Sequence, residues 1–485
     1  MVKSSTKSSR NSKISKRDVK DAIVNRSNSV SSLLNSKHVS IQEIKPDSRS
    51  TRRRKSPSIN LVELQLKKQS LDKRREATRK IRRNLKNVRG TLIPKIRARF
   101  LNAICSDAGV CVAFGKERET IRRHFNDFAN FEYATSRAKR IGKVSANGFV
   151  IDIPYERDGY MANAVLKSSM TNHSDNLLYE FAVGVRLNDI GAYVPCLIET
   201  YGLFRYKSEA KWEEASKKSV YRNMGKYVTE LNLPMDTMVK LSCKYPTRIC
   251  VLVQHLKNVK TIGDVIVNDL PFPEYEMLTS LFQIYFFLSM YRDVFTHYDL
   301  HTDNVLLYKP VDGKYIEYIY YLNEYDTFTF YSCVIPKIID YGRCHISESS
   351  GFLSYLCNEP ACDPNCGVNV GYEYFDPAPP EHAFGNISLE HPNVSHDLRL
   401  YNTIRRFYNK PLIKELKQCV YTGEYGTPPV QENSSNPNLI KNVTDCFLHI
   451  LDVLKKIPVP EPPTRDTVLA TMHVYGNKPM DVIYY

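Results

Sequence analysis

The apolar and polar positions divide the chain into an unpatterned N-terminal segment and a patterned remainder. Residues 1–58 contain no aromatic residue and are dominated by Ser, Lys, Arg and Asn. Such a segment cannot bury enough apolar surface to offset the entropy that ordering costs, so we expect it to be disordered. Over residues 60–89, a thin apolar stripe recurs at helical spacing among dense Lys and Arg, which predicts an amphipathic helix.

Beyond residue 137 the pattern predicts a β-rich region and then a mostly helical one. Apolar stretches of strand length lie near residues 141–153, 161–167, 196–206 and 248–256, and a periodic helix is expected over residues 175–187. The run Met277–Tyr291 is too short and too polar to span a bilayer, so it predicts a buried helix. Residues 315–333 are rich in Tyr, Ile, Phe and Thr, which predicts a β-hairpin.

The positive charge of the chain is confined to its first fifth. Residues 1–100 hold 29 Lys/Arg and 7 Asp/Glu, a charge of +22. The whole chain carries +16, so the remainder carries −6. Phosphate contacts from so basic a segment favour nucleic acid as a partner of residues 1–90. An acidic protein partner, a nuclear-import signal at Arg52–Lys55 and a solvated charge run are the alternatives.

Two motifs in the helical region carry chemistry. In His297–Leu307, Asp299 is followed five residues later by Asn304, and the motif runs into an apolar strand. A second apolar strand ends in Asp340-Tyr341-Gly342. Phosphoryl transfer needs a carboxylate at the incoming hydroxyl and oxygen ligands for Mg²⁺ between the ATP phosphates. Asp299 suits the first role, and Asn304 with Asp340 suits the second, whereas the alternative is a polar turn between strands.

Upstream residues complete this set. Lys167 ends a strand-like stretch, and Glu180 lies in the helix that follows it. A glutamate there can form an ion pair with the lysine and direct its ammonium to the ATP phosphates, whereas a buried lysine without such a partner tends to lose its proton. Taken alone, Lys167 would be interpreted as an exposed strand residue.

In this order the motifs resemble those of the eukaryotic-like protein kinase superfamily, from about Arg137 to the C-terminus. Haspin-type and other atypical kinases are similar in having Asp-Leu-His in place of Asp-Leu-Lys, Ile-Ile-Asp-Tyr in place of Asp-Phe-Gly at the metal-binding turn, and a long insert between the two strands. Phrases such as Cys105-Ser106-Asp107 and Glu199-Thr200-Tyr201-Gly202 also resemble kinase-like proteins of large DNA viruses.

The resemblance implies an α+β, two-lobed kinase-like fold preceded by the disordered basic tail. The domains expected are a tail at 1–90, an extension at 91–136 packed on the kinase, a β-rich N-lobe at 137–271 and a mostly helical C-lobe at 272–485. It also implies that ATP binds through a turn flanked by Gly142 and Gly148, and that His255 and Leu256 form a hinge at the adenine. Asp397 is expected to anchor the catalytic loop through its backbone.

The chain departs from the kinase pattern at several positions. Tyr298 replaces the arginine that usually reads an activation-loop phosphate, and His301 replaces the catalytic-loop lysine. The turn between Gly142 and Gly148 lacks the three-glycine pattern, so an ordinary turn is the alternative there. Cys357, Cys362 and Cys366 cluster at spacings loose for zinc, and we expect the cysteines to remain reduced because no signal peptide is visible.

The sequence therefore predicts an ATP- and Mg²⁺-dependent serine/threonine protein kinase of haspin-like type. We expect a protein substrate with basic segments, no membrane span, and an intracellular location in cytoplasm or nucleus, or in a host cell or virion if the protein is viral. The alternative is a weak or inactive kinase-fold scaffold that binds nucleic acid or viral proteins through its tail. A small-molecule phosphotransferase rests on Asp-Leu-His alone.

Overall fold

The computed structural model describes residues 112–142, 148–171, 176–257, 259–347, 351–357, 374–375, 383–384, 392–419, 439–458 and 460–485. The predicted tail and amphipathic helix of residues 1–90, and residues 91–111 of the expected extension, lie outside these ranges. The turn between Gly142 and Gly148, and Cys362 and Cys366 of the cysteine cluster, also lie outside them.

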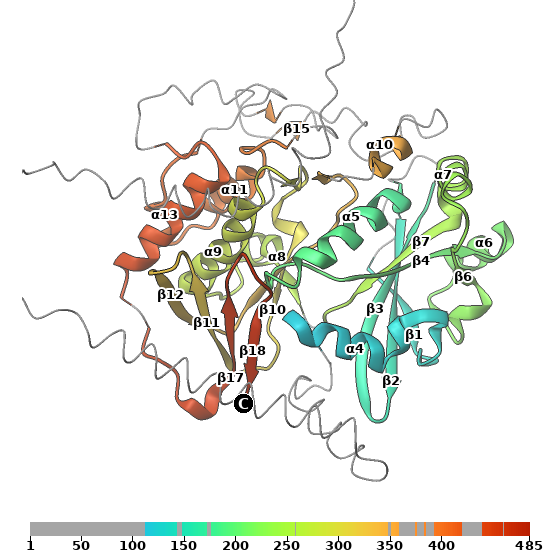
Figure 1. Ribbon diagram of the computed structural model, residues 1–485, viewed down its shortest axis with the longest axis horizontal. Coiled ribbons are helices and arrows are strands. Elements are labelled where there is room, and N and C mark those ends of the chain that lie inside the picture. The colour runs from blue at the N-terminus through green and yellow to red at the C-terminus, as the bar shows by residue number, and fades with distance from the viewer. Residues whose placement is uncertain are drawn as a thin grey trace, which may run out of the picture. The chain divides into compact units, whose positions relative to one another are not determined.

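A seven-stranded antiparallel sheet, in the order β5-β1-β2-β3-β7-β4-β6, forms the first part of the described chain (Figure 1). Its strands are β1 (Ala138–Ile141), β2 (Gly148–Arg157), β3 (Tyr160–Ser169), β4 (Thr200–Tyr206), β5 (Val220–Tyr221), β6 (Val228–Glu230) and β7 (Ile249–Gln254). The helices α5 (Leu177–Ile190), α6 (Glu209–Lys217) and α7 (Met235–Lys244) belong to the same part.

The sheet is curled rather than flat. Its two edge strands, β5 and β6, are consecutive in the sequence, and seven Cα steps lead from Tyr221 to Val228. An extended chain covers about 3.5 Å per step, so this connection reaches about 25 Å. Seven flat strands at a spacing of about 4.8 Å would place the edges about 29 Å apart, so the sheet has to curl to bring them together.

Residues 112–131 pack on the face of this sheet opposite Lys167. They form η1 (Gly115–Glu117), α4 (Arg118–His124) and η2 (Asn126–Phe131). Phe128 is fully buried, stacks on Tyr201 with ring centroids 4.0 Å apart and meets Tyr155 edge-on. Tyr155 lies five positions along β2 from Val150, the strand partner of Lys167, and alternation along a strand places it on the other face.

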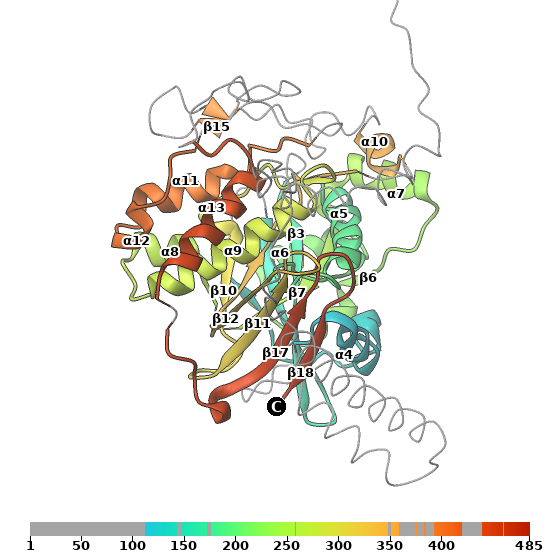
Figure 2. The same cartoon turned by 60° about the vertical axis from the view of Figure 1, so that its left-hand side comes forward.

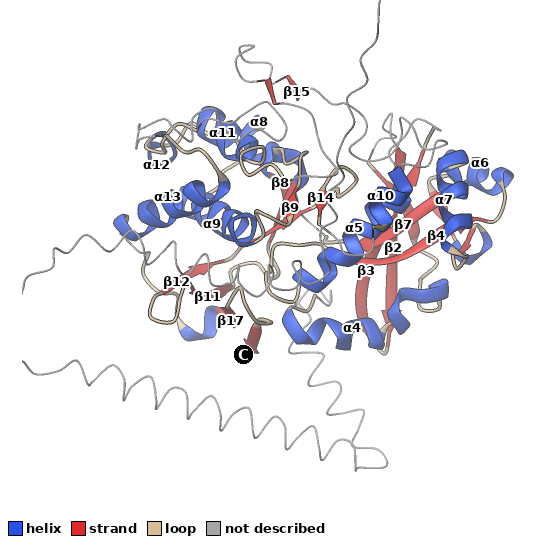
Figure 3. Ribbon diagram, turned by 45° about the horizontal axis from the view of Figure 1, so that its top comes forward, coloured by secondary structure: helices blue, strands red, loops and turns tan. Residues whose placement is uncertain are grey.

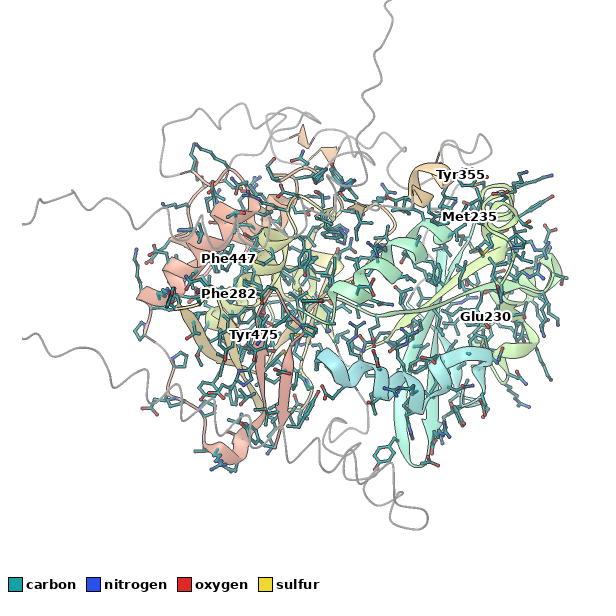
Figure 4. The ribbon with its side chains drawn as sticks, viewed as in Figure 1. Glu230, Met235, Phe282, Tyr355, Phe447 and Tyr475 are labelled. Atoms are coloured by element: carbon teal, nitrogen blue, oxygen red, sulfur yellow. The ribbon has the colours of Figure 1, made fainter. Side chains whose placement is uncertain are left out.

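The second part is mostly helical and surrounds a long buried helix (Figure 3). Its helices are α8 (Ile262–Val267), α9 (Glu274–Met290), α10 (Phe352–Cys357), α11 (Leu398–Phe407), α12 (Pro411–Lys414) and α13 (Val443–Lys456). Short strands accompany them: β8 (Lys260–Thr261), β9 (Phe295–Thr296), β10 (Val305–Tyr308), β13 (Ile335–Ile338), β14 (His345–Ile346), β15 (Tyr374–Phe375) and β16 (Ala383–Phe384). The buried helix predicted at Met277–Tyr291 is confirmed as α9, whose Phe282 meets Phe447 of α13 with ring centroids 5.5 Å apart (Figure 4).

The predicted hairpin is confirmed, but it belongs to a larger sheet. Its strands are β11 (Tyr315–Tyr321) and β12 (Thr327–Ser332). The C-terminal strand β17 (Val468–Val474) runs parallel to β11, and β18 (Asp481–Tyr484) pairs with β17 (Figure 2). These two C-terminal strands were not among the elements predicted from the sequence. An open hairpin edge would expose unpaired backbone groups, and β17 covers that edge.

The described residues confirm an α+β fold with two lobes: a curled antiparallel sheet with a helix against it, followed by a mostly helical part. Within the described ranges, no helix has the length and apolar character needed to cross a membrane. The expectation that the cysteines remain reduced is wrong for Cys243, which is disulfide-bonded.

Candidate active site

Lys167 lies on the central strand β3, between β2 and β7. Val150 and Val251 are its partners on those strands, so the three side chains share one face of the sheet. The Lys167 Nζ lies 2.8 Å from Glu180 Oε2 and 2.6 Å from Asp340 Oδ1. Burial alone lowers the pKa of Lys167, but attraction to Asp340 and Glu180 outweighs burial and holds the pKa above its ordinary value. The ammonium is therefore charged and held between the two lobes.

Helix α5 presents Glu180 to this lysine. The Asn176 side chain caps the helix by accepting a hydrogen bond of 2.9 Å from the Leu178 amide. Glu180 stands in the first turn and is buried. The neighbouring Tyr179 hydroxyl donates to the Cys344 carbonyl at 2.7 Å, which ties α5 to the segment after Asp340. The helix is thus fixed at the end from which Glu180 projects.

Asp340 occupies a strained turn directly after β13. Its φ is 68°, in the left-handed region, which costs a non-glycine residue about 1–3 kcal/mol. The Tyr341 hydroxyl holds the turn by donating to the Ile338 carbonyl and accepting from the Ile198 amide, both at 2.9 Å. Burial raises the pKa of Asp340, but attraction to Lys167 outweighs burial and leaves the pKa below its ordinary value. The carboxylate is therefore ionised and available to a cation.

The loop that carries Asp299 is anchored from α11. Asp397 accepts hydrogen bonds from the His297 amide at 2.7 Å and from the Tyr298 amide at 3.1 Å, which confirms the predicted anchor. Tyr298 is buried and has a φ of 61°, so this turn is strained as well. Burial raises the pKa of Asp397 to about 7 even though the two amides favour the ionised form. The His297 ring also bonds to the Ile339 carbonyl at 2.9 Å, which joins the loop to the Asp340 turn.

Asn304 connects Asp299 to a candidate metal position. Its side-chain nitrogen donates to the Asp299 carbonyl at 2.9 Å, so its side-chain oxygen faces elsewhere. The Ile339 amide donates to the Asn304 carbonyl at 3.0 Å, which joins the strand that follows Asn304 to the one that leads to Asp340. Carboxylate and amide oxygens are hard donors that suit Mg²⁺, which takes one or two protein carboxylates together with phosphate oxygens. Asp340 and Asn304 fit that requirement.

The two glycines predicted to flank a phosphate loop lie at facing strand ends. Gly142 follows β1 with a φ of +68°, a conformation that favours glycine. Gly148 opens β2, and a Cβ there would lie 2.3 Å from the Ser168 carbonyl oxygen. Backbone conformation therefore explains the glycine at 142, and lack of space for a side chain explains the glycine at 148. A role of these glycines in phosphate binding remains a prediction.

The predicted hinge begins where β7 ends. The His255 amide donates to the Asn163 carbonyl at 3.0 Å and extends the pairing of β3 with β7. The His255 ring nitrogen Nδ1 lies 2.8 Å from Asp152 Oδ1. The His255 amide is therefore used inside the sheet, and the hinge that His255 and Leu256 would form at the adenine remains a prediction. Leu256, which is buried, follows directly.

One charged residue near Asp299 was missed in the sequence. Arg399 Nη1 lies 3.5 Å from Asp299 Oδ1, and His301 Nε2 lies 3.7 Å from the same oxygen. His301 belongs to the recognised motif, but Arg399 comes from α11, almost a hundred positions later. Its only sequence signal is its place two residues after Asp397.

No family model matches the chain, and no curated protein matches it. The solved structures that match include the crystal structure of a Plasmodium kinase domain. The two sequences are 12% identical, the TM-score is 0.25, and the similarity covers 45% of this chain and 54%, about half, of that one. A likeness with this TM-score supports no conclusion about activity.

Proposed function

We propose that the protein is an ATP- and Mg²⁺-dependent protein kinase that phosphorylates serine or threonine hydroxyls. The observation that carries the proposal is the Lys167 ammonium held 2.8 Å from Glu180 and 2.6 Å from Asp340. A salt bridge with a purely structural role would not require a strained Asp340, with a φ of 68°, or a second loop tied beside it. Strained residues cluster where geometry serves chemistry.

Each residue then has a role in transfer. Lys167 binds phosphate oxygens, and Glu180 orients its ammonium. Asp299 accepts the hydrogen bond of the incoming hydroxyl and takes its proton as the bond to the γ-phosphorus forms and the bond to ADP breaks. Mg²⁺, which Asp340 and Asn304 would hold, neutralises charge on the phosphates when bound. Positioning and fixed charge account for most of the rate in such reactions.

Nucleotide binding is assigned to the neighbouring backbone. Gly142 and Gly148 flank the turn that would approach the phosphates, and the backbone of His255 and Leu256 would meet the adenine. The charge of −6 outside residues 1–100 favours a protein substrate with basic segments. We also propose that the kinase is of the haspin-like type. The Asp-Leu-His sequence and the inserted hairpin Tyr315–Ser332 support this assignment.

The proposal is tested by incubating the full chain with γ-labelled ATP and mixed protein substrates, with and without Mg²⁺. We expect Mg²⁺-dependent labelling of Ser or Thr. Asp299→Asn should keep nucleotide binding and lose transfer by orders of magnitude. Absence of labelling by the wild type, or wild-type turnover in Asp299→Asn, would contradict the proposal.

A second candidate is a kinase-fold scaffold that binds nucleic acid through residues 1–90. The observation in its favour is that this segment holds 26 Lys/Arg and 7 Asp/Glu. Its test is a salt titration of the full chain and of a deletion of residues 1–90 against a labelled duplex, with transfer activity measured in parallel. We expect the deletion to lower affinity on the order of 10³-fold at low salt, because counterion release drives such binding. A scaffold shows little or no transfer in either protein, whereas a kinase keeps its transfer after the deletion. Equal affinity of the two proteins would exclude the tail as the binding segment.

A further inference from the structure

The N-terminus of α11 contacts the Asp299 loop in two ways, through its N-cap residue Asp397 and through Arg399 in its first turn. Asp397 holds the backbone amides of His297 and Tyr298, as described above. Arg399 lies two residues after Asp397, and its Nη1 is 3.5 Å from Asp299 Oδ1. The Arg399 side chain is 20% exposed and that of Asp299 is 15% exposed, so the pair is shielded from solvent. Shielding strengthens an ion pair relative to one on the surface.

His301 lies farther from Asp299 than Arg399 does. The Asp303 amide donates to His301 Nδ1 at 3.2 Å, which orients the ring. Its Nε2–H lies 3.7 Å from Asp299 Oδ1, beyond hydrogen-bond distance. A guanidinium, by contrast, is charged at every accessible pH. Among the described residues, Arg399 is the permanently charged group within 4 Å of the Asp299 carboxylate.

We infer that Arg399 is a positioning residue for phosphoryl transfer. Its guanidinium lies at ion-pair distance from Asp299 Oδ1, and this attraction favours the carboxylate orientation that presents Oδ2 to the substrate hydroxyl. It supplies from α11 the positive charge that a lysine at position 301 would have supplied from the loop. The inference rests on the proposed kinase activity and deepens it, because Arg399 acts on the reaction only through Asp299.

The test is a double-mutant cycle in the full chain. Arg399→Gln removes the charge and keeps a long polar side chain, and Arg399→Lys keeps the charge without the planar fork. Arg406→Ala, on the exposed end of the same helix, is the control. We expect Arg399→Gln to lower kcat about 10- to 100-fold at unchanged KM for ATP, Arg399→Lys to recover much of the loss, and the control to match wild type. Thermal unfolding of each variant reports whether α11 is intact.

The cycle with Asp299→Asn separates positioning from a structural effect. If Arg399 acts through Asp299, adding Arg399→Gln to Asp299→Asn should change the residual single-turnover rate less than about threefold, because the two losses are not additive. Equal losses in both backgrounds, a raised KM for ATP, or a wild-type kcat in Arg399→Gln would overturn the inference. If Asp299→Asn has no measurable rate, a failure of Arg399→Lys to exceed Arg399→Gln in kcat would overturn it. An inactive wild type would instead overturn the proposed function itself.

Discussion

Asp340→Asn should separate metal binding from folding. Asparagine tolerates a φ of 68° and keeps an oxygen near Lys167 Nζ, so the variant removes one negative charge and little else. Lys167 is 29% exposed and retains Glu180, so the lost ion pair costs about 0–1 kcal/mol of unfolding free energy. At about 2–4 °C per kcal/mol, the Tm should fall by less than about 4 °C. The fold should therefore survive the change.

The response to nucleotide should change far more. A ligand at 100 times its Kd adds about 2.7 kcal/mol to the stability of the folded state, or about 5–10 °C in Tm. In the wild type we expect an increment of this size with ATP and Mg²⁺, and a smaller one with ATP and EDTA. In Asp340→Asn the Mg²⁺-dependent part should fall to about 1 °C or less, because Asn304 alone cannot replace the carboxylate.

The assay is thermal unfolding of the wild type, Asp340→Asn and Asp303→Asn in three conditions: no nucleotide, ATP with EDTA, and ATP with Mg²⁺. Asp303 is a matched control from the same loop, whose carboxylate accepts a hydrogen bond from Thr261 at 3.3 Å. It should keep the full Mg²⁺ increment. An undiminished increment in Asp340→Asn, or an equal loss in both variants, would refute the assignment of the metal to Asp340.

Three further outcomes follow from the described contacts. Phe128→Ala should lower the unfolding free energy by about 3–5 kcal/mol in denaturant titrations, because Phe128 is fully buried, whereas Phe407→Ala, at a 54% exposed position, should change it by about 0.5 kcal/mol or less. Burial lowers the pKa of Lys337 to about 7, so the unfolded state binds its proton more tightly between pH 7 and 10. Stability should therefore rise with pH across that window, and a rise that persists in Lys337→Met would contradict this origin. Glu180→Gln keeps a hydrogen-bond partner for Lys167 but not the charge, and steady-state kinetics should show kcat/KM for ATP about tenfold lower; an unchanged ratio would remove Glu180 from its role.

Elements whose apolar pattern lies within one short segment could be predicted from the sequence. The unbroken apolar run at Met277–Tyr291 predicted α9, and the Tyr- and Ile-rich stretch at 315–333 predicted the hairpin. The C-terminal strand β17 was missed for a physical reason. Its partner is β11, some 150 residues earlier, and the parallel pairing of distant segments leaves no trace in either segment alone.

The candidate site also contains residues that could be predicted and contacts that could not. Asp299, Asn304 and Asp340 could be predicted because each belongs to a short motif with a characteristic spacing. The pairing of the His255 amide with the Asn163 carbonyl could not be predicted, because register cannot be read from one strand. Arg399 was missed because its meeting with Asp299 depends on how α11 packs, and packing is a property of the whole fold.

The strained residues of the site are held by bonds from elements remote in sequence. Tyr298, with a φ of 61°, depends on Asp397 of α11, and Asp340, with a φ of 68°, depends on the bond between Tyr341 and Ile198. Strain of about 1–3 kcal/mol at each position persists only where surrounding bonds fix the backbone. These bonds join the loop before Asp299 to the N-cap residue of α11, and the turn at Asp340 to the segment before β4, so contacts between elements remote in sequence fix the backbone around both carboxylates.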